Sequence, residues 1–87
     1  MKAYIYILKD KGGRFYIGST KNILQRMKRH NAKLSPATAR MHEPELVLFQ
    51  EYDSVKIARR IEAKIKRLKR KDYIQRMVVD GYIKLKP

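Results

Sequence analysis

The chain has 87 residues, no cysteine and a formal net charge of +14, from 22 Lys and Arg against 8 Asp and Glu. This length predicts one domain spanning residues 1–87. The lack of cysteine excludes disulfide frameworks, thiolate zinc sites and cysteine nucleophiles. The charge exceeds the magnitude of about 2 to 8 that suits a small domain. A polyanion is therefore the expected partner, nucleic acid first and an anionic membrane surface second.

The first elements in chain order are two strands and a helix. Residues 1–8 are rich in Tyr and Ile, which favours a strand. Turn residues follow, and residues 14–18 predict a returning strand. Ser19 or Thr20 is predicted to cap a helix over residues 21–31. The predicted buried stripe of this helix consists of Ile23, Leu24 and Met27.

The register of this hairpin follows from its tyrosines. Tyr6 and Tyr16 share a sheet face if Leu8 pairs with Tyr16 and Tyr6 pairs with Gly18. That pairing leaves an odd loop of three residues, and a loop of two residues would send the tyrosines to opposite faces. We predict the three-residue loop, with Gly13 in the left-handed conformation of a bulge turn.

The second half of the chain predicts one strand and two helices. Residues 46–52 form the third strand, and Asp53-Ser54 caps a helix over residues 55–69. A shorter helix begins at Lys71 or Asp72 and ends near Val79. The stripe of the long helix is Ile57, Ile61, Ile65 and Leu68. The order ββαβαα predicts an α+β fold in which a small three-stranded antiparallel sheet packs with helices. The longest apolar run, residues 3–8, is too short for a signal peptide or a membrane span, so we expect a soluble, cytoplasmic protein.

Four sequence features resemble the GIY-YIG nucleases. The strings Tyr4–Tyr6 and Tyr16–Gly18 are similar to the two halves of the signature, and Gly-Ser-Thr-Lys-Asn-x3-Arg-x3-His continues it over Gly18–His30. The segment Ala58–Leu68 is similar to the helix that carries the family's metal-binding glutamate. The match covers about residues 3–70 and is most similar to small stand-alone members. Residues 1–87 are thus predicted to be a single GIY-YIG-like nuclease domain.

The resemblance implies metal-dependent hydrolysis of DNA phosphodiester bonds. Tyr16 would activate the attacking water, with Tyr6 beside it. Arg26 would neutralise charge on the scissile phosphate, and His30 would handle a proton or contact phosphate. Glu62 would hold Mg²⁺ or Mn²⁺, because a hard cation that keeps several waters needs few protein ligands. A phenol, with an ordinary pKa of about 10, becomes a useful base only when nearby cations favour its charged form.

Three positions depart from the family's pattern. Tyr4 stands where the family name has Gly, a change with no expected effect on the chemistry. Ser19 stands where some relatives place a lysine near the phosphate, so charge stabilisation would depend on the cations of the next helix. No Pro-x-Asn follows Glu62, and Gln75 is a candidate substitute for that asparagine.

The basic residues predict how nucleic acid is held. The residues predicted to follow its backbone are Lys21, Arg26, Lys64, Arg67 and Lys69. Phosphate contacts position a protein without reading bases. The sequence has no recognition helix, zinc finger or basic zipper, so we expect cleavage to follow substrate structure rather than base sequence.

Other interpretations stay open at this point. The tyrosines also suit ordinary strand positions, and Glu62 also suits an ion pair with Arg59 or Lys66. Glu62 is, however, the only acid between Val55 and Lys71, at the border of the buried stripe, which favours a ligand role. The alternative function is a nucleic-acid-binding module with the same fold that does not cut. A membrane-surface helix ranks last, because its isoleucine stripe is needed for the core.

Overall fold

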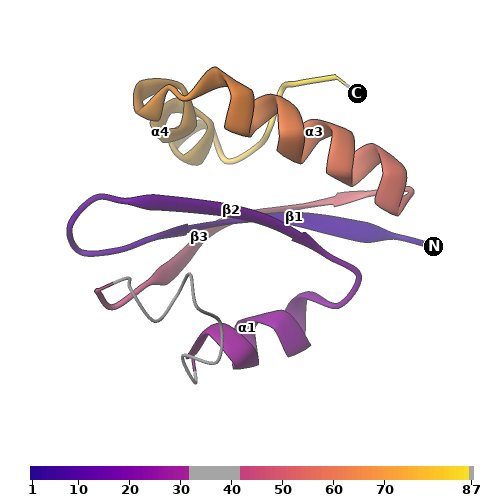
Figure 1. Cartoon of the computed structure of the whole chain (residues 1–87), viewed down its shortest axis with the longest axis horizontal. Helices are drawn as coiled ribbons and strands as arrows, with labels where there is room; N and C mark the ends of the chain where they lie inside the picture. The colour runs from indigo at the N-terminus through magenta and orange to yellow at the C-terminus, as the bar shows by residue number, and fades with distance from the viewer. Residues whose placement is uncertain (32–41, 87) are drawn as a thin grey trace.

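The computed structural model describes residues 1–31 and 42–86, apart from the side chains of residues 30 and 31. Its elements are β1 (Ala3–Lys9), β2 (Phe15–Thr20), α1 (Ile23–Asn31), β3 (Glu45–Tyr52), α3 (Val55–Leu68) and α4 (Lys71–Asp80). The predicted α+β class and the order ββαβαα are confirmed. Figure 1 shows three layers, with α3 and α4 over one face of the sheet and α1 over the other.

The sheet has the strand order β2-β1-β3, so β2 lies at an edge. Both neighbours run antiparallel to β1, and Tyr6 pairs with Gly18 while Leu8 pairs with Tyr16, as predicted. The loop between β1 and β2 has the predicted odd length. The N–H of Gly13 donates to the carbonyl of Asp10 (3.0 Å), and the φ of Gly13 is 85°. This left-handed conformation confirms the bulge turn.

The alternation of side chains along β1 creates two separate apolar clusters. On the α3 side, Ala3, Ile5 and Ile7 contact the buried face of α3, which consists of Ala58, Ile61 and Ile65. On the α1 side, the cluster is smaller and centres on Tyr6 and Leu8. It is completed by Tyr16, Ile23, Met27 and Leu46. The larger cluster supplies most of the buried apolar area, and the smaller one carries the tyrosines.

Two predictions about α1 are wrong. Leu24 is 76% exposed, because it lies about 100° around the helix from Ile23 and the helix buries only a narrow stripe. The cap is neither Ser19 nor Thr20. The side-chain oxygen of Asn22 accepts from the N–H of Gln25 (3.0 Å) and caps the helix.

The remaining ends of the fold are held by side-chain hydrogen bonds. Ser54 caps α3 by accepting from the N–H of Ile57 (3.2 Å), which confirms the predicted cap. The side chain of Gln50 accepts from the N–H of Ile83 (2.7 Å) and donates to its carbonyl (3.2 Å), which ties the segment after α4 to β3. None of the helices within the described ranges combines the length and apolarity that a membrane crossing requires.

Candidate active site

Two tyrosines and an arginine meet on the α1 side of the sheet. Tyr6 comes from β1 and Tyr16 from β2, and their ring centroids lie 6.2 Å apart. Arg26 comes from α1, is half-buried, and acts on the Tyr6 phenol through its charge and a hydrogen bond. The structure therefore brings together three of the predicted catalytic residues, from three different elements.

Gly18 is required by the position of Tyr6. The two residues are paired across β1 and β2, so their side-chain directions point to the same face. A Cβ atom on Gly18 would fall on the Tyr6 hydroxyl and lie 2.6 Å from Cζ of the same ring. Tyr6 has no exposed surface and no room to move away. A glycine at this position thus lets the Tyr6 phenol lie flat over β2.

The two tyrosines differ in the chemistry open to them. Tyr6 has 0% exposure, and its pKa is raised to about 12, first by burial and then by Tyr16, against a lowering effect of Arg26. A phenol in this state keeps its proton at neutral pH and has no access to water. Tyr16 is only partly buried. Geometry therefore favours Tyr16 over Tyr6 as the residue that faces a substrate.

Glu62 approaches the same edge strand from the α3 side. The Ser19 hydroxyl donates to Oε1 of Glu62 (2.6 Å), and Nζ of Lys66 lies 2.8 Å from Oε2. Ser19 directly follows Gly18, and neighbouring residues of a strand point to opposite faces. One peptide unit of β2 therefore separates the tyrosine cluster from the carboxylate. The two halves of the site therefore lie on opposite faces of the edge strand β2.

The carboxylate fits a divalent cation held by one protein ligand. Within residues 1–31 and 42–86, no three His, Asp or Glu side chains with described positions gather into a metal site. A hard cation such as Mg²⁺ or Mn²⁺ keeps several waters and accepts a single carboxylate. The Glu62 side chain is 18% exposed, and its partner Lys66 is 55% exposed. Such a pair at i,i+4 spacing contributes only about 0.3–0.5 kcal/mol, so a cation can displace the lysine.

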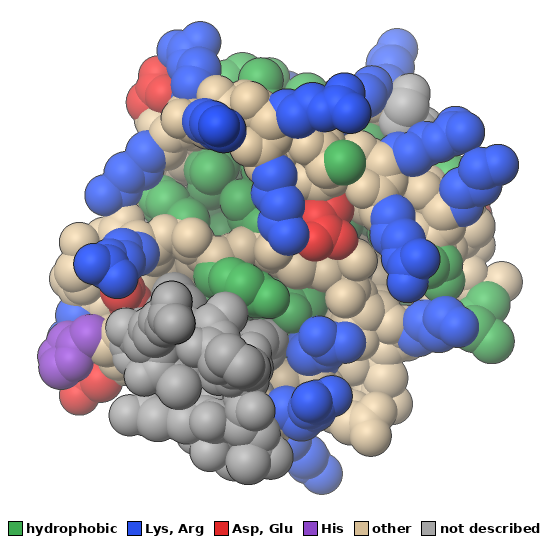
Figure 2. Space-filling model, viewed as in Figure 1, with side chains coloured by type: hydrophobic (Ala, Val, Ile, Leu, Met, Phe, Trp, Pro, Cys, Tyr) green, Lys and Arg blue, Asp and Glu red, His purple; other side chains and the backbone are tan. Residues whose placement is uncertain are grey.

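The predicted nucleic-acid contacts lie in three places. Lys21 and Arg26 line one pocket at the end of β2. Lys64 lies about 200° around α3 from Glu62 and donates to the backbone carbonyl of Lys86 instead. Arg67 and Lys69 are exposed at the end of α3. Figure 2 shows Lys and Arg side chains spread over most of the face that is not grey, with acidic side chains confined to small patches.

Two further predicted residues, His30 and Gln75, differ in what the structure describes of them. His30 belongs to α1, but its side chain lies outside the described residues. Gln75 accepts a hydrogen bond from Lys9 (3.3 Å), a residue that pairs with Phe15. Phe15 lies four residues from Ser19 along β2, about 13 Å at strand spacing. Gln75 is thus at the wrong end of β2 to replace the asparagine of larger family members.

Sequence reasoning missed three contributors to the site. Ser19 was interpreted as a candidate helix cap and as a missing lysine, although it orients Glu62. Lys66 and Arg59 were weighed only as ion-pair partners, although they share one face of α3 with Glu62 at i+4 and i−3 spacing. The strand alternation contained the signal for Ser19, because it places Ser19 opposite the tyrosine face.

Comparison with known proteins identifies the family of this chain. The family model described as the GIY-YIG catalytic domain matches residues 2–76. A UPF0213 protein of Streptococcus pneumoniae is 36% identical over 70 residues, covering 79% of this chain and 71% of that protein. A UPF0213 protein of Staphylococcus haemolyticus is 32% identical over 75 residues, covering 85% and 92%. The solution NMR structure of a UPF0213 protein of Bacillus halodurans superposes with a TM-score of 0.60 at 32% identity, covering 93% of this chain and 87% of that one. The chain therefore belongs to the GIY-YIG nuclease family.

Proposed function

We propose that this protein is a metal-dependent endonuclease that hydrolyses DNA phosphodiester bonds and selects its substrate by structure rather than by sequence. The observation that supports this most directly is that Tyr16 and Arg26 lie on the α1 side of the edge strand β2, while Glu62, on the α3 side, accepts a hydrogen bond from Ser19, three residues after Tyr16. A base, a cation and a metal-binding carboxylate are the groups that phosphodiester hydrolysis needs.

Each residue has one role in this proposal. Tyr16 takes the proton of the attacking water, and Arg26 neutralises charge on the scissile phosphate. Tyr6 is a positioning residue, because it is fully buried and acts through its contacts with Tyr16 and Arg26. Glu62 holds Mg²⁺ or Mn²⁺, oriented by the Ser19 hydroxyl. The cation, when bound, supplies Lewis-acid stabilisation of the phosphate and the leaving oxygen.

His30 assists with a proton or a phosphate contact in the same proposal, as the family resemblance implies. The cationic surface supplies affinity without base readout, because contacts to phosphate oxygens carry no sequence information. Lys21, Arg67 and Lys69 are the residues proposed to make such contacts, and all three are exposed. Substrate choice then depends on which DNA shape brings a phosphate to the edge of β2.

A second function has one specific observation in its favour. Both oxygens of Glu62 already have partners, the Ser19 hydroxyl at 2.6 Å and the Lys66 ammonium at 2.8 Å. If Lys66 keeps this position when metal is present, the protein is a non-catalytic module that binds nucleic acid. The two functions differ in one measurement, which is cleavage in the presence of a divalent cation.

Tyr16→Phe tests the proposal. The purified protein is incubated with branched, nicked, single-stranded and plain duplex DNA, and with RNA, in Mn²⁺ with and without chelator. The Phe variant keeps the ring and should fold, but we expect its rate to fall by about 10²- to 10⁴-fold. The matched control is Tyr4→Phe, which removes a hydroxyl from the same sheet face; this hydroxyl donates to Glu51 (3.1 Å), away from Tyr16. Equal rates for wild type and Tyr16→Phe would refute the role of Tyr16. Binding without cleavage of any substrate would favour the second function.

A further inference from the structure

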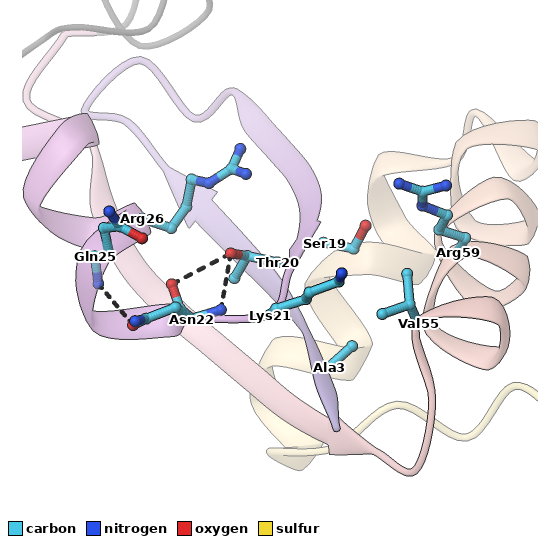
Figure 3. A pocket seen from close by; sticks show the side chains of 9 residues that line it. All are labelled: Ala3, Ser19, Thr20, Lys21, Asn22, Gln25, Arg26, Val55 and Arg59. Atoms are coloured by element: carbon cyan, nitrogen blue, oxygen red, sulfur yellow. Dashed lines mark hydrogen bonds between the residues drawn. The ribbon is translucent and has the colours of Figure 1, made fainter. Parts of the chain in front are cut away.

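A pocket of about 270 Å³ opens beside the site, where the end of β2, the first turns of α1 and the first turns of α3 meet. Pockets for whole small-molecule ligands usually measure about 300–1,000 Å³, so this one suits a smaller group. Three of its lining residues are cations, namely Lys21, Arg26 and Arg59, and none of the described residues that line it is acidic. Figure 3 shows Arg26 entering from α1 and Arg59 from α3, with Ser19 and Lys21 between them.

Among the described residues, the cations of this pocket have no acidic partners. Several cations elsewhere have acidic partners, such as Lys2 with Glu51 and Arg70 with Asp72. In the part of the chain that the structure describes, neither Lys21 nor Arg59 has an acidic group within ion-pair distance. Converging cations without an acid raise the local potential and attract an anion.

The backbone around Lys21 is held in place before any ligand arrives. The hydroxyl of Thr20 accepts from the N–H of Asn22 (3.1 Å), and the Asn22 side chain then caps α1 by accepting from the N–H of Gln25 (3.0 Å). Lys21 lies between these two hydrogen-bonded residues, and its side chain extends toward α3 in Figure 3. Such preorganisation lowers the ordering cost of binding.

The pocket shares one residue with each half of the candidate active site. Arg26 acts on the buried Tyr6 phenol, and Ser19 donates to Glu62. An anion in this pocket is therefore a neighbour of the scissile group. Resting on the proposed function, we propose that Lys21 and Arg59 clamp an internal phosphodiester of the substrate strand next to the one that is cut. An arginine fork and a lysine ammonium are the usual partners of phosphate oxygens.

A double-mutant cycle between protein and DNA tests this contact without requiring cleavage. Binding of fluorescein-labelled DNA is measured in chelator, with single methylphosphonate linkages that remove one phosphate charge at a time. For wild type, one neutral linkage beside the cut site should weaken binding. In Lys21→Ala and Arg59→Ala, the same linkage should have an effect at least about twofold smaller, because interacting groups are not additive. The control is Arg76→Ala, which removes an exposed charge from α4, outside this pocket.

The outcomes separate this inference from the proposed function. If every neutral linkage weakens DNA binding by Lys21→Ala and Arg59→Ala as much as it weakens binding by wild type, the pocket holds no internal phosphate, even if the protein cuts DNA. If coupling appears instead with removal of a terminal phosphate, the pocket captures a strand end and the inference is wrong. Coupling at one internal linkage supports the clamp, whether or not cleavage is detected.

Discussion

Gly18→Ala should destabilise the protein although alanine is intrinsically the better strand residue. Glycine in a strand costs roughly 0.5–1 kcal/mol relative to alanine, so an unhindered substitution would stabilise. Here the new methyl group would lie 2.6 Å from Cζ and 3.0 Å from Cε1 of Tyr6, which is fully buried. Overpacking of this kind typically costs about 1–3 kcal/mol, which exceeds the gain. We therefore expect a net loss of stability.

The matched control is Gly12→Ala in the same hairpin. A Cβ atom at Gly12 would lie 3.4 Å from the Asp10 carboxylate oxygen, an ordinary contact, and the φ of Gly12 is not positive. Both substitutions reduce the entropy of the unfolded chain, so this effect cancels in their comparison. Thermal and urea unfolding followed by circular dichroism give the difference. Each kcal/mol corresponds to roughly 4–8 °C in Tm for a domain of this size.

The same variant also links stability to the site. Displacing Tyr6 would disturb its contacts with Tyr16 and Arg26, so any cleavage activity should fall more in Gly18→Ala than in Gly12→Ala. If Gly18→Ala is as stable as Gly12→Ala, the Tyr6 phenol does not lie over β2 as described. The account of the tyrosine cluster would then be wrong.

Three further predictions concern charge. Glu62→Gln should abolish metal-dependent cleavage while DNA binding stays equal or tightens, since a negative charge leaves a cationic helix. If this variant, assayed against wild type, still cuts in a metal-dependent way, Glu62 is not the metal ligand. Tyr6 has a pKa of about 12 in the folded state against about 10 in the unfolded state. The folding stability that comes from this difference is therefore complete below pH 10 and is lost between pH 10 and 12. The loss is about 2–3 kcal/mol, and urea unfolding at these pH values should show a smaller alkaline loss for Tyr6→Phe. Replacing Arg67 and Lys69 with Ala should reduce the log–log salt slope of binding by roughly 0.9 for each lost duplex phosphate contact, and an unchanged slope would place the nucleic acid elsewhere.

Much of the hairpin and the helices could be read from the sequence because their causes are local. The left-handed Gly13 and the pairing of Tyr6 with Gly18 follow from loop length and side-chain alternation alone. The long helix begins at the predicted Val55, because Ser54 caps it, and its isoleucines repeat at helical spacing up to within one residue of its predicted end. The same reasoning failed for Leu24, since a helix pattern does not say how wide a stripe the neighbouring layer will cover.

Only the tertiary structure decided how the site is assembled. The sequence by itself placed Tyr16, Arg26 and Glu62 on a strand and two helices, and the family resemblance assigned their roles. Whether these elements meet depends on β2 being an edge strand between two helical layers, a property of the strand order rather than of any local segment. That order brings Ser19 to Glu62, 43 positions later in the chain, and it gathers Lys21 and Arg59 around one pocket. Such contacts between distant segments are set by packing of the layers, on which neither propensity nor periodicity carries information.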